Sequence, residues 1–475
     1  MKLLARLMLV LFGMHATLAF AGVFADLNSS GEVDAVDVQL VINAALDIPV
    51  AFPTDLNTSG ATDAVDVQLV INAALDIVPA SVNRPFPQHV TYAAGSLIVN
   101  SRSQAQLDDD VRAAYDRWKT NYLAQAGVDS NNRPRYRVKF STAADAPTVS
   151  EGQGYGMIIV AHMAGHDTNA RTIFDGLWQF VVDHRSENDP RLPDWWVNGD
   201  ESADTKGDTS AFDGDADVAY ALLLADAQWG STGNVHYRNE ALTMLQGILA
   251  SEIGPDSRLP LLGDWVDPAG DDINQYVTRA SDFLIGHFRA YERASGNAVW
   301  LQVVSACQAA TTLIQTDHSA TTGLLPDFLA PTSAIDHTLR PAPPNILEAP
   351  TDGMYSYNAG RVPWRIGTDW LLNGNASSRA QAQKISIWVQ GATGGDPLEI
   401  KPGYQLNGTP IPPADYFTTF FAAPLGIAAM CTPGQLTWLN AVYEAVYTRE
   451  EGYYEDSVTL LSMLVMTGNF WDPTQ

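Results

Sequence analysis

Helical periodicity recurs along most of this 475-residue chain and restricts its fold more than any other feature of the sequence. Apolar residues return every three or four positions, which places them on one face of a helix, whereas the alternation typical of strands is scarce. One such stripe consists of Val218, Leu222, Ala225 and Trp229. We therefore predict an all-α main domain with helices in the segments 107–123, 155–166, 170–183, 218–229, 237–252, 281–295, 380–390 and 436–448.

The N-terminal part of the chain contains a tandem repeat, because residues 34–48 recur unchanged at 63–77. Each copy completes a loop with oxygen-bearing groups at positions one, three, five and twelve and a glycine at position six. This spacing lets a short loop wrap around a hard cation such as Ca²⁺, to which position seven adds its main-chain carbonyl. A pair of metal-free turns is the alternative. The predicted ligands are Asp26, Asn28, Ser30, Glu32 and Asp37 in the first loop and Asp55, Asn57, Ser59, Ala61 and Asp66 in the second.

The segments around the repeat suggest how the chain is organised. Lys2 and Arg6, a short apolar stretch and a small-residue cleavage site at 19–21 are typical of a secretory signal peptide. A proline-punctuated stretch after the repeat has the character of a linker. We predict a signal peptide at 1–21, a repeat module at 22–78, a linker at 79–84 and a main domain at 85–475. The protein should be secreted, either extracellular or periplasmic, and Cys307 and Cys431 allow at most one disulfide.

The charge balance limits the partners. The chain carries 27 basic and 54 acidic residues, a net charge of −27, which argues against nucleic acid and anionic membranes as ligands. After the signal peptide no window of about 20 apolar residues could span a membrane. An acidic surface suits calcium, a cationic polymer or simple solubility, and a solvated surface is the commonest of these.

Three motifs carry candidate chemistry. In the first, Glu151 lies among Gly152, Gly154 and Gly156, and alternate glycines suggest unusual backbone dihedrals or a close approach, with helix capping as the alternative. The second is the segment 211–229, in which three alternate aspartates open a helix, more than capping requires. The third, 355–369, mixes aromatic, arginine and amide side chains as sugar-binding clefts do.

Together these motifs resemble glycoside hydrolase family 8, from about Pro85 to Trp471, with Phe212 where that family usually has Ser or Thr. Residues 415–430 are similar to the family as well. The resemblance implies an (α/α)6 barrel, an open cleft for a β-1,4-linked polysaccharide, hydrolysis with inversion and no cofactor for catalysis. The repeats resemble dockerin modules, which implies calcium and a cohesin-type scaffold partner. Asp rather than Glu at position twelve fits dockerins better than EF-hands.

Within this resemblance, Glu151 matches the general acid and Asp213 the aspartate at the subsite of the distorted sugar. Inversion needs an acid and a base roughly 6.5 to 9.5 Å apart. The usual position of the base is Asn358, whose amide cannot accept the proton. A subgroup of the family with Asn here, including chitosanases and β-glucanases, takes its base from a loop upstream. We therefore predict Glu348 as the base, with Asp352 and Asp336 as competitors.

The remaining candidates concern substrate binding. We expect Arg361 to orient a carboxylate or the Asn358 amide, because its rigid fork suits that role. Asp215 and Asn358 are the other polar residues that we expect to bind substrate. The candidate stacking platforms, each with core packing as the alternative, are Trp195, Trp196, Trp265, Tyr357 and Trp364.

The sequence thus favours a secreted, inverting endo-β-1,4-glycanase acting on β-glucan or cellulose, or on chitosan. A non-catalytic carbohydrate-binding or assembly protein, in which Asn358 marks lost activity, is the alternative from another class. A polysaccharide lyase on a similar helical barrel is a weaker one, because lyases generally use Tyr/His or Lys/Arg groups that face uronates.

Overall fold

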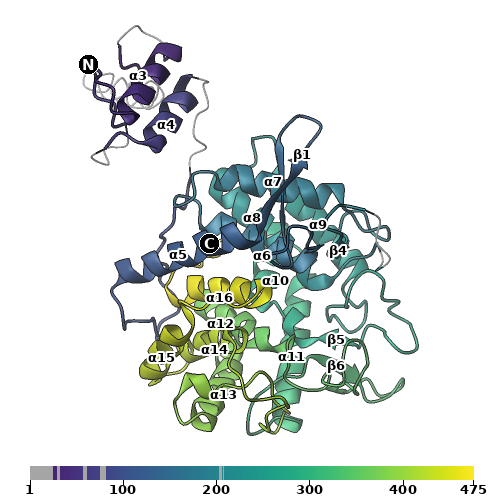
Figure 1. Cartoon of the computed structure of the whole chain (residues 1–475). Helices are drawn as coiled ribbons and strands as arrows, with labels where there is room; N and C mark the ends of the chain where they lie inside the picture. Colours follow the sequence, from purple (N-terminus) through teal and green to yellow (C-terminus); the bar gives the residue numbers. More distant parts are fainter. Residues whose placement is uncertain (1–24, 29–32, 57–60, 75–81, 203–205, 207) are drawn as a thin grey trace, which may run out of the picture. The chain divides into compact units, whose positions relative to one another are not determined.

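The computed structural model describes residues 25–28, 33–56, 61–74, 82–202, 206 and 208–475 (Figure 1). The chain divides into two compact units, one up to Ser81 and one from Val82 to Gln475, and each is described by itself. The predicted signal peptide and the first half of the predicted linker, residues 79–81, lie outside the described residues. Among the residues that are described, no helix is long and apolar enough to cross a membrane.

The first unit contains the two helices of the repeat, α3 (Ala35–Ala45) and α4 (Ala64–Ala74), which pack against each other. Each helix has only one apolar stripe, so two copies can bury what one copy would leave exposed. Their shared core contains Ala25, Val41, Leu56 and Val70.

The second unit is a barrel of paired helices. The inner ring consists of α6 (Ser150–His162), α8 (Phe212–Trp229), α10 (Ile285–Ser295), α12 (Val362–Asn373), α14 (Thr419–Met430) and α16 (Tyr453–Met466). Each inner helix contacts the next, and α16 contacts α6, which closes the ring. The outer helices are α5 (Gln104–Tyr122), α7 (Ala170–Asp183), α9 (Tyr237–Ser251), α11 (Val299–Asp317), α13 (Ala376–Ala392) and α15 (Leu436–Val446). Each of them packs on one or two inner helices. This arrangement is the expected (α/α)6 barrel.

The two rings differ in their sequence patterns because they differ in burial. Outer helices such as α7 bury one face, and their periodicity predicted α5, α7, α9, α13 and α15. Inner helices are more enclosed, and every residue of α14 is buried. A helix that is buried all round carries no amphipathic stripe, although periodicity still indicated the inner helices α6, α8 and α10. The helices not predicted are α12, α14 and α16 of the inner ring and α11 of the outer ring.

The three glycines beside Glu151 lie within α6 and have ordinary helical dihedrals, so the expectation of unusual dihedrals was wrong. The expectation of a close approach was correct. A Cβ on Gly152 would overlap the Tyr453 side chain. On Gly154 it would lie 2.7 Å from Asp217 Cβ, and on Gly156 2.5 Å from Val138 Cγ2. Helix α6 therefore packs more tightly against α8 and α16 than any larger residue would permit.

Short strands connect the helices. A three-stranded antiparallel sheet contains β5 (Thr278–Arg279), β6 (Phe328–Pro331) and β7 (Leu339–Pro341) in that order. Two further pairs are β1 (Leu123–Val128) with β2 (Pro134–Val138), and β3 (Thr148–Val149) with β4 (Trp196–Val197). The connections also contain the 3₁₀ helices η1 (Ala280–Asp282), η2 (Ala359–Arg361) and η3 (Pro397–Glu399).

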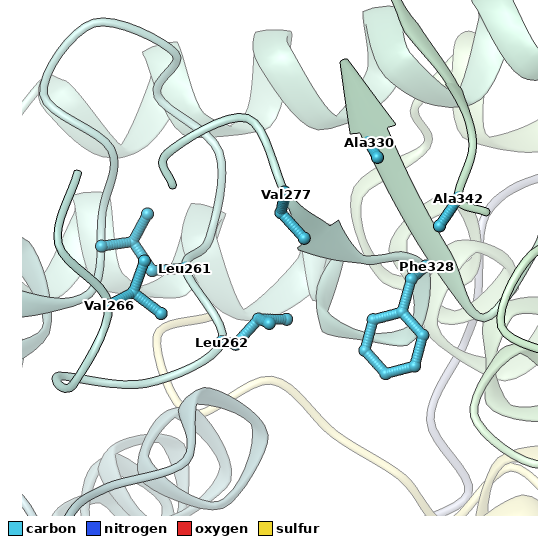
Figure 2. Packing of buried hydrophobic residues seen from close by; sticks show 7 residues of the cluster. All are labelled: Leu261, Leu262, Val266, Val277, Phe328, Ala330 and Ala342. Carbon is cyan, nitrogen blue, oxygen red and sulfur yellow. The ribbon is translucent and has the colours of Figure 1, made fainter. Parts of the chain in front are cut away.

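The three-stranded sheet has a small hydrophobic core of its own. Figure 2 shows its buried members, to which Ile346 adds a partly buried side chain. A core of this kind fixes the connections that it joins, as the main core fixes the helices. The buried members are Leu261, Leu262, Val266, Val277, Phe328, Ala330 and Ala342.

The disulfide that the sequence allowed is not formed. Cys307 and Cys431 are both buried, and both are free.

Candidate active site

Functional side chains gather where inner helices begin. Glu151 is the second residue of α6 and Asp213 the second residue of α8. Arg361 directly precedes α12, and Tyr453 opens α16. The N-terminal end of a helix carries a partial positive charge, which favours carboxylates at both acidic positions.

Arg361 joins these residues. Its side chain is buried, and Nη1 donates to Glu151 Oε2 and to Asp213 Oδ2, each at 2.7 Å. Nη2 donates to Asn358 Oδ1 at 3.1 Å and to Ser281 Oγ at 2.9 Å. Arg361 therefore contacts both kinds of group that it was expected to orient, a carboxylate and the Asn358 amide.

The two carboxyl groups on Arg361 differ in protonation. Burial raises the pKa of Glu151 to about 7, even though Arg361 opposes this shift. Burial also acts to raise the pKa of Asp213, but Arg361 and Arg279 outweigh it and lower that pKa to about 2. Between these values, Asp213 is ionised while Glu151 keeps its proton. An acid and an anion on one guanidinium are the pair that acid catalysis at an acetal requires.

Asn358 connects this pair to Glu348. Its Nδ2 donates to Glu348 Oε2 at 2.8 Å, while its Oδ1 accepts from Arg361. Arg279 Nη2 donates to the other oxygen of Glu348, Oε1, at 3.1 Å. An aspartate at 358 could accept from Arg361 but, when ionised, could donate nothing to Glu348. The amide therefore complements a carboxylate at position 348, whose side chain is 44% exposed.

The two competitors for the role of base lie differently. Asp352 is 1% exposed, and its oxygens accept the N–H groups of Leu347, Glu348 and Ala349. It therefore fixes the loop that presents Glu348. Asp336 lies in the exposed turn between β6 and β7, where its Oδ1 accepts from the Thr338 N–H.

Several residues at the site carried no sequence signal that we recognised. Tyr453 Oη donates to Glu151 Oε1 at 3.3 Å. Asp327 is buried, and its Oδ1 accepts the N–H groups of Ser356, Asn358 and Ala359. An isolated Asp or Tyr can be recognised as part of the site only from its contacts in the structure, because its partners are distant in sequence.

Asp215 does not lie where a sugar could reach it. The side chain is fully buried, against Glu252, and burial raises the pKa of Asp215 well above its usual range. The predicted contact between Asp215 and substrate therefore disagrees with the structure. Its neighbour Asp217 is also buried and is paired with Arg365 (Nη1 to Oδ1, 2.9 Å) and with His287 (3.0 Å). The second and third aspartates of the motif thus support the site from within.

The candidate stacking platforms divide into three groups by exposure. Trp265 and Tyr357 are 39% and 37% exposed, so both can offer a ring to a ligand. Trp195 and Trp196 are half-buried neighbours, with ring centroids 5.5 Å apart. Trp364 is 1% exposed, which corrects its prediction as a platform in favour of core packing.

The first unit contains the predicted calcium loops. Asp37, at position twelve, is buried and accepts the N–H groups of Leu27 and Asn28 at the start of its loop. Asp66 accepts the Leu56 N–H at the same place in the second loop. Each carboxylate thus reaches the other end of its loop, as a Ca²⁺ ligand at position twelve must.

Four predicted ligands, Ser30, Glu32, Asn57 and Ser59, lie outside the described residues. Within the described part, no three His, Cys, Asp or Glu side chains are grouped so as to hold a metal ion. The carboxylate and amide oxygens at positions one, three and twelve are nevertheless the donors that Ca²⁺ prefers.

Comparisons with known proteins agree for both units. Residues 84–468 match the model for glycosyl hydrolases family 8, and residues 24–75 match the dockerin type I domain. A β-glucanase of Niallia circulans is 40% identical, over 82% of this chain and 92% of its own. An endoglucanase of Bacillus sp. strain KSM-330 is 38% identical over 82% of each chain. The solved structure of a β-1,3-1,4-glucanase from Paenibacillus sp. X4 has a TM-score of 0.77 at 39% identity, and it covers 83% of this chain and 100% of that one.

Proposed function

Since the chain belongs to glycosyl hydrolase family 8 and is a glycoside hydrolase of the endoglucanase and β-glucanase type, we propose that it cleaves β-1,4 linkages within uncharged β-glucans and inverts the anomeric configuration. The β-glucanase and endoglucanase relatives support the substrate class. The three relatives named above are described by their activity on glucan, and none by activity on chitosan.

The observation that carries this proposal is the connected set Glu151–Arg361–Asn358–Glu348. Protonated Glu151 delivers its proton to the glycosidic oxygen as the bond to the anomeric carbon breaks. Glu348 accepts a proton from the water that attacks the opposite face. Asp213, held ionised by Arg361, stabilises the positive charge that develops on the sugar.

Asn358 is then a functional replacement rather than a sign of lost activity. Its amide binds the base through Nδ2 and the central arginine through Oδ1. A non-catalytic protein would have no need for a protonated Glu151 beside an ionised Asp213. The same reasoning supports placing this chain in the subgroup of the family that has Asn at the usual position of the base.

The test compares the wild type with Glu151→Gln and Glu348→Gln on mixed-linkage β-glucan, carboxymethyl cellulose and chitosan, with NMR detection of the first anomer released. We expect the wild type to release the α-anomer from glucan and each variant to lose roughly 10²- to 10⁴-fold in kcat. Glu399→Gln is the matched control, because that exposed glutamate pairs only with Lys401 among the described residues. A wild type inactive on all three polymers would exclude the glycanase, and full activity of Glu348→Gln would exclude that base.

We also propose that the dockerin type I domain holds structural calcium and docks to a cohesin-type partner outside the cell. Asp26, Asn28 and Asp37 are the described ligands of the first loop, and Asp55, Ala61 and Asp66 those of the second. The cation would hold the loops closed and supply no chemistry to catalysis. The signal-peptide pattern at 1–21 supports secretion.

A further inference from the structure

Arg279 lies on strand β5, outside all three motifs that the sequence indicated. Its backbone is paired with Phe328 of β6, and its guanidinium lies over the Phe328 ring, 5.3 Å from the centroid. Phe328 belongs to the buried cluster beneath the small sheet (Figure 2). The backbone of Arg279 is therefore fixed against a packed hydrophobic cluster and does not belong to a free loop.

The guanidinium of Arg279 faces three carboxyl groups. Nη2 lies 3.1 Å from Glu348 Oε1, while Nη1 lies 3.6 Å from Asp213 Oδ2 and 3.7 Å from Asp282 Oδ2. The side chain is 11% exposed, and its Nε has no hydrogen-bond partner among the described residues. A buried donor without a partner costs free energy. The two amino groups, with their carboxylate partners, therefore set the orientation of this side chain.

The loop that carries Glu348 is attached to the same residue of β6. The Phe328 N–H donates to the Asp352 carbonyl, and the Asp352 carboxylate binds the N–H of Glu348. The backbone of Glu348 and the backbone of Arg279 are thus fixed relative to each other through Phe328. Only the side chain of Glu348 remains to be oriented.

That orientation depends on two donors. Each oxygen of Glu348 accepts one hydrogen bond, Oε2 from Asn358 and Oε1 from Arg279. Without Arg279, a side chain that is 44% exposed could swing toward solvent, because the one remaining hydrogen bond, from Asn358, does not fix its orientation.

We propose that Arg279 is a positioning residue that holds the Glu348 carboxylate in place for accepting the proton of the attacking water. This rests on the proposed function, in which Glu348 is the base. Arg279 acts on the reaction through Glu348 and contacts Asp213 at the same time, so it fixes the base relative to the subsite of the reacting sugar.

The test measures kcat and KM on mixed-linkage β-glucan for Arg279→Gln and Arg279→Ala. We expect kcat to fall about 10- to 100-fold with KM changed less than about threefold, since a small displacement of a catalytic group has effects of this size. Millimolar guanidinium should restore several-fold activity to Arg279→Ala and none to Glu348→Gln.

Arg289→Gln is the matched control, because Arg289 is also a largely buried arginine paired with an aspartate, Asp369, at 2.8 Å. It should lose stability without the fall in kcat. A crystal structure of Arg279→Gln gives a readout that does not need activity, and it should show the Glu348 carboxylate turned away from Asn358.

A wild-type kcat in Arg279→Gln would overturn the proposal. So would an activity loss that matches Arg289→Gln, with no rescue by guanidinium, or a Glu348 side chain unmoved in the variant structure. A wild type that fails to hydrolyse β-glucan would instead refute the proposed function, and the variant structure would still test the positioning role.

Discussion

Glu151 and Asp213 share one arginine but hold opposite protonation states, and their other contacts explain why. Asp213 has a second cation, Arg279, and the N–H of Gly214 at 3.0 Å, all of which stabilise its ionised form. Besides Arg361, Glu151 accepts a hydrogen bond from the Tyr453 hydroxyl at 3.3 Å, while the negative charge of Asp213 acts to raise the pKa of Glu151. Desolvation therefore dominates for Glu151 and not for Asp213. The difference in pKa arises from a few neighbours and not from the type of residue.

The pH dependence of activity should reflect Glu151. This group donates a proton, and its pKa is raised to about 7, so its protonated fraction falls as pH rises through that value. We expect kcat/KM on β-glucan to decline about tenfold per pH unit above roughly pH 7. Initial rates across a buffer series check this, and Glu151→Gln should lack the decline. A wild-type kcat/KM that stays unchanged up to pH 9 would contradict this prediction.

Asn358→Asp should lower activity, although it creates the residue that the family usually has. The new carboxylate would face Glu348 at a distance of about 3 Å, where two like charges cannot both be ionised. We expect a roughly tenfold or larger loss of kcat. In Glu348→Gln/Asn358→Asp, the Gln amide can donate to the new carboxylate, and part of the activity should return relative to Glu348→Gln. Equal kcat values for Asn358→Asp and wild type would contradict this account.

At the level of elements, the glycines of α6 determine how closely the inner helices approach. Gly154 faces α8 where the carboxylates Asp213 and Asp217 begin that helix. The close approach brings Glu151 and Asp213 to one guanidinium. Packing between two inner helices thus sets the geometry of the acid and its neighbouring anion.

Gly154→Ala should destabilise the barrel. Its Cβ would lie 2.7 Å from Asp217 Cβ, 3.2 Å from the Gly214 carbonyl oxygen and 3.3 Å from the Val218 nitrogen. Two of these atoms belong to a buried backbone that cannot move freely, so we expect a loss of about 1–3 kcal/mol in the free energy of unfolding. Thermal unfolding measures it. Gly391→Ala in α13 is the control, because its Cβ meets nothing within 4 Å and should stabilise by about 0.5–1 kcal/mol.

At the level of the whole molecule, two units with different organising principles share one chain. The first is small and depends on a duplicated loop and helix, with a core of a few side chains. The second has a closed ring of buried helices. Small cores supply little stability by themselves, which is why metal ions often support them.

Calcium binding should occur in the first unit of the intact chain. After treatment with a chelator, calorimetric titration should detect two sites, and Asp37→Asn or Asp66→Asn should each remove one, because a neutral amide replaces the charged ligand at position twelve. Asp47→Asn is the control, since this exposed residue follows α3 and lies outside both loops. An absence of heat in the wild type would contradict the calcium proposal.

The sequence by itself determined the features that depend on neighbours along the chain. The amphipathic outer helices, the repeat, the glycines that permit close packing and the motifs of Glu151 and Asp213 all follow from local patterns. Inner helices such as α14 and α16 escaped prediction because full burial removes the periodicity on which the prediction relies.

Only the tertiary structure decided which residues meet. Arg361 contacts Glu151 across 210 positions of sequence, and Arg279 contacts Glu348 across 69. It also decided that Asp215 and Trp364 belong to the interior, although their motifs resembled a substrate cleft. Burial and contact depend on how the whole ring closes. No local pattern encodes them, and for that reason the sequence singled out Glu151 while the fold supplied its partners.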